Sequence, residues 1–171
     1  NFNKFTIKSQ EAIQQGQQIA QSFENQQIEN SHILKGIFEV DENVTPFILK
    51  KLGVNIDLLK SVIDKVIEGY PKVSGGDIML SRDASKMLNN ASNEAKKMND
   101  EFVSIEHLLL AIFNAKGSVG QALKDQGVTK NNLLSAITEL RKGDRVTSQS
   151  AEDQYNAVNK YARNLNQLAT D

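Results

Sequence analysis

A displacement of 75 residues brings two long stretches of the chain into register, and this internal duplication constrains the fold more than any other feature. Residues 28–38 lie over residues 103–113 with four identities (a His, a Leu, an Ile and a Phe) and three near-isosteric pairs. The small and apolar residues that precede each stretch also coincide, at steps of three and four. After one gap, residues 52–69 lie over residues 126–143. Chance rarely keeps register over about 65 residues, so we expect two copies of one structural unit.

Helix start and stop signals divide each copy into four segments. In the first copy we expect helices from an N-cap at Thr6 to about Phe23, from Asn30 or Ser31 to about Val40, from an N-cap at Thr45 with Pro46 following to Gly53, and from Asn55 to Gly69. The second copy repeats the pattern from Ser81 to Met98, from Ser104 to Phe113, from Ser118 to Gln126, and from Thr129 to Arg141. No stretch alternates apolar and polar residues clearly enough to predict a strand. The predicted fold class is therefore all-α, with two pseudo-symmetric four-helix repeats.

The two repeats are expected to pack as one globule, because a unit of about 65 residues cannot cover the apolar stripe of its first helix alone. Repeat one spans about 5–69 and repeat two about 80–143, and together they form a predicted domain at 1–143. The loop between them, residues 70–77, contains the glycines, proline and serine typical of a turn. Residues 144–171 are predicted to be a linker, polar at first and then a C-terminal linker helix with the apolar stripe Tyr155, Val158, Tyr161, Ala162, Leu165 and Leu168.

The charge balance and composition exclude several classes of function. Lys and Arg number 20 against 21 Asp and Glu, so we expect no nucleic-acid partner and no membrane partner. The absence of Cys excludes thiolate chemistry and Cys-ligated metals. No apolar run resembles a membrane span or a signal peptide, so we expect a soluble, cytoplasmic protein. The short basic pairs are expected on solvated helix faces: Lys50-Lys51, Lys96-Lys97 and Arg141-Lys142.

The chain shows no set of residues that would carry catalysis. Lys116-Gly117-Ser118 lacks the upstream glycine and the preceding strand of a phosphate loop, so we interpret it as a turn that caps the next helix. His32 and His107 occupy equivalent repeat positions in a first helical turn, and neither has a second metal ligand three or four residues later. We expect structural roles for both. The sequence therefore predicts no enzyme, no bound cofactor and no metal in this chain.

The paired motifs resemble a known family. Thr6 opens a first helix, residues 28–38 recur at 103–113, and Leu52-Gly53-Val54 precedes the fourth helix. In this order, over about residues 5–143, they resemble the Clp N-terminal domain, a double four-helix repeat at the front of Clp-type AAA+ unfoldases. The tail from Arg145 to Asp153, with Tyr155 and residues 160–165, is similar to the segment that joins this domain to the first ATPase ring in the ClpB branch. The ClpC branch typically has a Glu before the His of both repeats, whereas this chain has Ser31 and Glu106.

The resemblance implies a substrate-recognition domain of a ClpB-type, ATP-dependent disaggregase, which engages unfolded or aggregated polypeptides and passes them to the ATPase rings. Residues 144–171 would then be the linker and the start of an AAA+ module, ATP and Mg would bind in the AAA+ modules, and the parent would be a homohexamer that works with the DnaK system. The alternative is an adaptor-docking domain of a ClpC- or ClpA-type unfoldase that feeds a protease.

The resemblance also assigns client contacts to four positions: Thr6, Leu88, Asp100 and Glu106. The competing interpretation is structural. Thr6 would then be an N-cap, Asp100 a loop residue, Glu106 a first-turn acid favoured by the helix dipole, and Leu88 part of the core.

Overall fold

All eight helices predicted by the start and stop signals are present in the computed structural model, which describes residues 2–155. Repeat one begins with a 3-10 turn, η1, and contains four helices and a short strand: η1 Phe2–Lys4, α1 Ile7–Ser22, β1 Gln27–Ile28, α2 Asn30–Val40, α3 Val44–Lys51 and α4 Ile56–Glu68. Repeat two begins with a short strand: β2 Met79–Leu80, α5 Arg82–Lys97, α6 Ile105–Asn114, α7 Ser118–Asp125 and α8 Lys130–Arg141. The all-α prediction is confirmed.

Several helices begin with the side-chain caps that the sequence predicts. Thr6, Asn55, Ser81 and Thr129 each accept a hydrogen bond from the backbone N–H three residues later. Such a cap satisfies one of the N–H groups that a helix leaves free at its first turn. These local signals therefore fix where α1, α4, α5 and α8 start.

The predicted start of the third helix is wrong. Thr45 is not the N-cap, because α3 begins one residue earlier, at Val44. The carboxylate of buried Asp41 accepts the backbone N–H groups of Asn43 and Val44 at 3.1 Å and that of Thr45 at 2.6 Å. Pro46 lies in the first turn, where its missing N–H costs no hydrogen bond. A carboxylate upstream of the helix therefore does the capping that was assigned to Thr45.

Two short parallel pairings cross between the repeats. β1 of repeat one pairs with β2 of repeat two, with Ile28 opposite Leu80. The equivalent pairing, displaced by 75 residues in each partner, places Phe5 opposite Val103. Each pairing is too short to produce a recognisable alternation of apolar and polar residues, so neither strand could be predicted. In both pairings a backbone segment of one repeat is hydrogen-bonded to a segment of the other, as expected of two repeats that pack as one globule.

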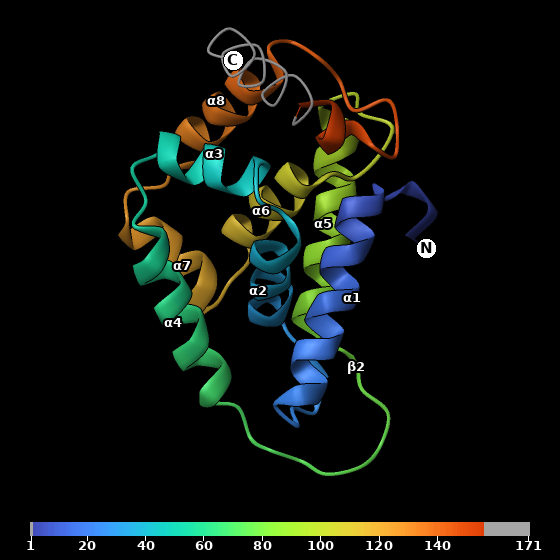
Figure 1. Cartoon of the computed structure of the whole chain (residues 1–171), viewed down its shortest axis with the longest axis vertical. Helices are drawn as coiled ribbons and strands as arrows, with labels where there is room; N and C mark the ends of the chain where they lie inside the picture. Colours follow the sequence, from blue (N-terminus) through green and yellow to red (C-terminus); the bar gives the residue numbers. More distant parts are fainter. Residues whose placement is uncertain (1, 156–171) are drawn as a thin grey trace, which may run out of the picture.

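The helices also exchange partners between the repeats. α3 packs against α8, and α4 packs against α7 (Figure 1). Interchanging the two repeats converts the first contact into the second, which is the signature of a pseudo-twofold arrangement. α2 and α6 lie at the centre of the molecule, and both are buried over most of their length.

The most extensive helix–helix contact in the described part of the chain is between α1 and α2. A Cβ built on Gly36 would lie 2.5 Å from the carbonyl oxygen of Ala12 and 2.9 Å from the backbone nitrogen of Gly16. Real Cβ atoms do not approach backbone so closely, so this crossing requires glycine at position 36. In repeat two the equivalent position holds Ala111, and the corresponding helices contact each other less extensively.

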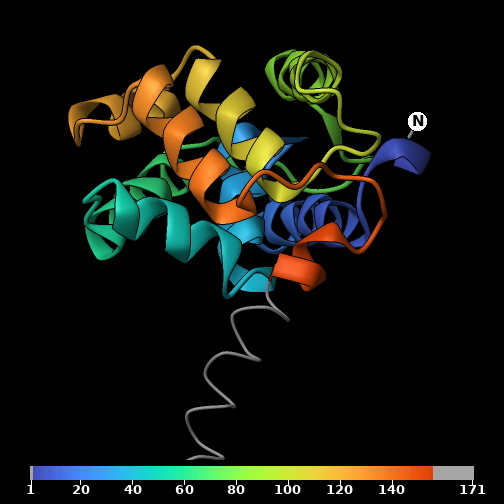
Figure 2. The same cartoon turned by 90° about the horizontal axis from the view of Figure 1, so that it is seen from above.

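The described part of the predicted linker lies against the body of the domain. The chain leaves α8 and crosses the end of α1 (Figure 2), where Gln149 accepts the backbone N–H of Ile7 at 2.9 Å. Val146, Ala151 and Tyr155 are buried, and residues 151–155 are helical. The boundary after position 143 stays a prediction, and the rest of the apolar stripe expected in the last helix lies outside the described residues.

Candidate functional site

Three of the four residues assigned to client contact lie in one buried polar cluster. Thr6 caps α1, Asp100 lies in the loop between α5 and α6, and Glu106 lies in the first turn of α6. Thr6 and Glu106 are fully buried, and Asp100 is 8% exposed. Arg141 at the end of α8 and Glu152 of the C-terminal segment complete this group. We call these five residues the polar cluster.

Thr6 connects the start of α1 to the C-terminal segment. Its Oγ1 accepts the backbone N–H of Ser9 at 3.1 Å and donates to Oε2 of Glu152 at 2.6 Å. The same carboxylate oxygen accepts the backbone N–H of Ile105 at 2.9 Å. Glu152 therefore joins the first turns of α1 and α6, one from each repeat.

Asp100 is held by donors from three parts of the chain. Its Oδ2 accepts from Nε2 of His107 at 2.7 Å and from Nη1 of Arg141 at 2.9 Å, and its Oδ1 accepts from the backbone N–H of Val146 at 2.9 Å. Burial by itself would raise the pKa of Asp100, but these hydrogen bonds and the charge of Arg141 hold that pKa below its usual value. The carboxylate is therefore ionised and fully engaged inside the protein.

Arg141 is the cation of the cluster, and the prediction that it lies on a solvated helix face is wrong. The residue is 6% exposed, and its Nε donates to Oε2 of Glu106 at 2.9 Å. Because it also contacts Asp100, one guanidinium is shared by two buried carboxylates. Its neighbour Lys142 is exposed, as expected.

Three buried oxygens in or beside the polar cluster have no hydrogen-bond partner among the described residues: Oε1 of Glu106, Oε1 of Glu152 and the hydroxyl of Tyr155. Burial, and next the charge of Glu106, raises the pKa of Glu152 to about 7. The same two causes raise the pKa of Tyr155. Glu152 is thus close to half-protonated at neutral pH.

Leu88, the fourth assigned residue, lies outside the polar cluster. It is 5% exposed and lines a pocket of about 170 Å³ formed by the N-terminal turn, β2 and α5. The other lining residues are Phe2, Phe5, Leu80, Ser85, Asn89 and Ser92. Phe2 is 41% exposed, and its ring meets that of Phe5 edge-on, with centroids 5.2 Å apart. We call this the Leu88 pocket; it offers apolar surface beside three uncharged hydrogen-bonding side chains.

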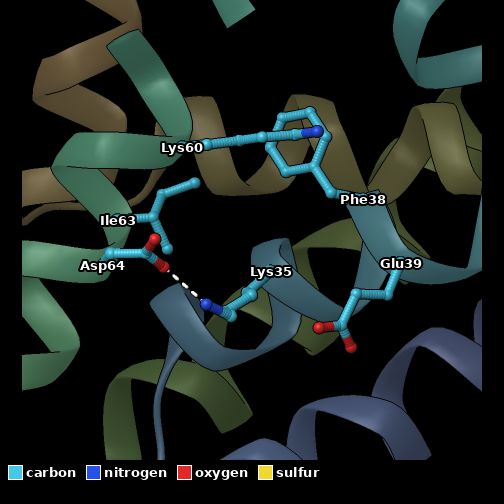
Figure 3. A pocket seen from close by; sticks show the side chains of 6 residues that line it. All are labelled: Lys35, Phe38, Glu39, Lys60, Ile63 and Asp64. Carbon is cyan, nitrogen blue, oxygen red and sulfur yellow. Dashed lines mark hydrogen bonds and ion pairs between the residues drawn. The ribbon is translucent and has the colours of Figure 1, made fainter. Parts of the chain in front are cut away.

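A second pocket lies between α2 and α4 (Figure 3). Lys35 bonds to Asp64 within it, and the ammonium of Lys60 lies 5.3 Å from the ring centroid of Phe38. The carboxylate of Glu39 accepts a hydrogen bond from Gln15, outside the pocket. None of the residues assigned from the sequence lies here.

The two histidines have the structural roles that the sequence predicts. In each repeat the Nδ1 of the histidine accepts the backbone N–H of the N-cap residue at 2.9 Å, from Glu29 to His32 and from Ser104 to His107. The proton on Nε2 then reaches Asn25 in repeat one at 2.8 Å and Asp100 in repeat two. Burial lowers the pKa of His32 to about 4, so this ring is neutral at physiological pH.

Within residues 2–155 no group of three or more His, Cys, Asp or Glu side chains is arranged to hold a metal ion. Among these same residues no helix is long and apolar enough to cross a membrane.

Comparison with known proteins places the chain in a family. Residues 4–126 match the Clp repeat (R) N-terminal domain. The chain belongs to this family. It is 53% identical over 169 residues to the chaperone protein ClpB of Bacteroides thetaiotaomicron, and 46% identical over 171 residues to that of Porphyromonas gingivalis. These matches cover 99% and 100% of this chain but 20% of each relative, so the chain spans about a fifth of their length.

The solved structures confirm the fold of this Clp N-terminal domain. The Hsp104 N-terminal domain from Candida albicans is similar with a TM-score of 0.76 and 20% sequence identity, over 87% of this chain and 99% of that chain. The N-terminal domain of ClpD from Arabidopsis thaliana is similar with a TM-score of 0.64 and 22% identity, over 83% of this chain and 97% of that chain. At these identities the likeness concerns the fold alone.

Sequence reasoning found only Leu88 among the residues that line the Leu88 pocket, and it missed two of the five residues of the polar cluster. In the Leu88 pocket it missed Phe5 and Leu80, although a signal was present, since both precede an N-cap and they are equivalent under the 75-residue displacement. In the polar cluster it missed Arg141 and Glu152. Nothing in the sequence pairs those two residues with Thr6, Asp100 or Glu106, because partners such as Thr6 and Glu152 lie 146 residues apart.

Proposed function

We propose that this Clp N-terminal domain is the substrate-recognition domain of a ClpB-type, ATP-dependent protein disaggregase. In this function it engages unfolded or aggregated polypeptides and passes them to ATPase rings elsewhere in the parent protein. The similarity to ClpB chaperones over the whole chain supports this family role. The observation that carries client binding is the Leu88 pocket, which is lined by apolar side chains from both repeats and includes the exposed ring of Phe2.

The chemistry of the Leu88 pocket suits a client without a defined sequence. Unfolded chains expose apolar side chains, and a pocket floored by Phe5, Leu80 and Leu88 would take one of them. The peptide groups of an unfolded chain have no intramolecular hydrogen-bond partners. The uncharged side chains at the rim of the pocket can bind them: Ser85, Asn89 and Ser92. Neither interaction depends on client charge, which favours broad recognition.

Thr6, Asp100 and Glu106 are proposed to support this site indirectly. Their polar atoms are buried and bonded within the chain, so they are placed to position other groups. The backbone N–H of Thr6 donates to the carbonyl of Val103 at 2.9 Å, which fixes the turn that carries Phe5 into the pocket. A substitution in the polar cluster would then alter client binding through the position of the N-terminal turn.

The partners and cofactors of the parent follow from the same proposal. ATP and Mg would bind in the AAA+ modules, and this chain would bind no nucleotide and catalyse no reaction by itself. The parent would act as a homohexamer with the DnaK system, without nucleic acid or a membrane as partner.

Binding of a permanently unfolded, fluorescently labelled model protein to the 171-residue chain, in the absence of any adaptor, tests the proposal. Phe2→Ser is expected to weaken binding about tenfold, because the loss of one buried aromatic contact is worth more than 1.4 kcal/mol. Leu88→Ala is expected to act in the same direction, with its melting temperature measured in parallel. Leu58→Ser is the matched control, since Leu58 is 51% exposed on α4, away from the pocket.

Equal binding by Phe2→Ser and the parent chain would show that the Leu88 pocket is not the client site. If the chain does not bind unfolded protein but binds an adaptor of a protease-coupled unfoldase, the adaptor-docking alternative of the ClpC or ClpA type replaces the proposal.

A further inference from the structure

Residues 144–155 form a strap that is fastened to the domain at several points, and we use this name for them below. The carbonyl of Val146 accepts the N–H of Glu101 at 2.8 Å, and its own N–H donates to Asp100. Further along, Gln149 is bonded to Ile7 of α1. The strap therefore touches elements of both repeats before it leads on toward residue 156.

A further fastening point of the strap is the carboxylate of Glu152, which is 1% exposed. It lies between Thr6 of α1 and the N-terminal turn of α6, and its Oε2 accepts from both. Its Oε1 is buried without a partner among the described residues. A buried carboxylate with one oxygen unsatisfied is an unfavourable arrangement when it is ionised.

The charge of Glu106 makes the ionisation of Glu152 more unfavourable still. The other charged and titratable groups of this buried region are Asp100 of the α5–α6 loop, Arg141 of α8, Tyr155 of the strap, and His107 of α6, which is bonded to Asp100 at 2.7 Å. Ionised Asp100 and Glu106 against one guanidinium leave a net charge of −1 in the buried site, and an ionised Glu152 would make it −2.

One proton on Glu152 reduces the buried negative charge from −2 to −1 and supplies a missing hydrogen-bond donor. With Glu152 ionised, the three unpartnered oxygens comprise two acceptors and a single donor, the hydroxyl of Tyr155. Protonation at Oε1 of Glu152 supplies a second donor for the buried acceptor on Glu106. With this proton the three groups hold two donors, the carboxyl of Glu152 and the hydroxyl of Tyr155, for the remaining carboxylate acceptor on Glu106.

We propose that a single proton held between Glu152 and Glu106 fastens the strap to the domain, and that loss of this proton loosens the strap. The strap is a protonation-sensitive clasp between the Clp N-terminal domain and the chain that follows it. Its fastened state is favoured at acidic pH, becomes weaker as the pH rises toward neutrality, and changes little above that.

The pKa of Glu152 sets the size and sign of the effect. The fastened state has a pKa of about 7, against the ordinary value of 4.5 for a released, solvated Glu152. Between these values the fastened state binds more protons than the released state. The stabilisation that the proton on Glu152 gives to the fastened state is therefore fully present below pH 4.5 and is lost as the pH rises through about 7. Between about pH 6 and about pH 8 the equilibrium constant for fastening is expected to fall about tenfold.

Amide hydrogen exchange of residues 144–155 in the 171-residue chain tests the clasp. After correction for intrinsic exchange, protection of the strap is expected to fall about tenfold from about pH 6 to about pH 8, while protection of α2 and α6 stays constant. Glu152→Gln supplies a neutral donor and acceptor of similar shape and should keep the strap protected at both pH values. Asp153→Asn removes the same charge from an exposed neighbouring side chain and should leave the pH dependence as in the parent chain.

Two results would overturn the proposal. One is unchanged strap protection between the two pH values in the parent chain. The other is a pH dependence in Glu152→Gln as large as that of the parent, which would assign the effect to another group. If Glu152→Gln lowers the protection of α2 and α6 as well, a pKa of Glu152 below about 6 by carboxyl NMR titration of the parent would reject the clasp, and a value near 7 would support it.

Discussion

Replacement of Arg141 by Met tests whether the polar cluster depends on one buried cation. Met preserves most of the side-chain volume but removes the guanidinium that donates to Asp100 and Glu106, each at 2.9 Å. Both carboxylates would remain buried with one charge partner fewer. Removal of one partner from a buried ion pair costs about 3–5 kcal/mol. For a chain of this size that loss lowers the melting temperature by about 10 °C.

The assay is denaturant unfolding at about pH 7, followed by far-UV circular dichroism, with Lys142→Met as the matched control. Lys142 is the next residue and is exposed, so its loss of charge should change stability by less than about 0.5 kcal/mol. The deficit of Arg141→Met should shrink as the pH falls toward about 5, because carboxylates without a cation take up protons at higher pH. One cooperative transition is expected, since the repeats complete each other. If the free energy of unfolding of Arg141→Met lies within about 1 kcal/mol of that of Lys142→Met, the polar cluster does not depend on the buried cation.

Two further stability measurements follow from the same structure. Thr6→Ala should destabilise the chain by about 1.5–3 kcal/mol more than Ser81→Ala, because both lose an N-cap but Thr6 also loses its bond to Glu152; equal losses would remove Glu152 from the explanation. Gly36→Ala should cost about 1–3 kcal/mol in thermal or chemical unfolding, because the new Cβ would meet the carbonyl of Ala12 at 2.5 Å, and an unchanged stability would show that α1 and α2 can separate freely.

Local signals in the sequence predicted most of the fold. Helix starts at Thr6, Asn55 and Ser81 depend on a side chain and an N–H only three residues away, so no knowledge of the tertiary structure is needed. The exception, Asp41, shows the limit of these rules. An acid upstream can cap a helix as well as the Thr within it, and the chain path between them decides which one does.

Of the residues that line the Leu88 pocket, the sequence analysis named only Leu88. Leu88 could be named from the resemblance, but its role as a pocket wall requires Phe2 and Phe5, which come from the other repeat. The crossed strand pairings that bring these segments together involve one or two residues each. So short a pairing leaves no periodicity to detect.

The sequence by itself determined that this chain has two equivalent four-helix units, where most helices begin, and that both histidines serve their own helix starts. These features depend on contacts within a few residues, which composition and spacing record directly. Only the tertiary structure decided that Arg141 is buried, that Glu152 meets Thr6, and that the strap is fastened across both repeats. The sequence of an amphipathic helix does not show whether a charged residue at its end is solvated by water or paired with a carboxylate 35 residues away. Its partner is chosen by the packing of distant elements, because that packing decides which charges lose their water.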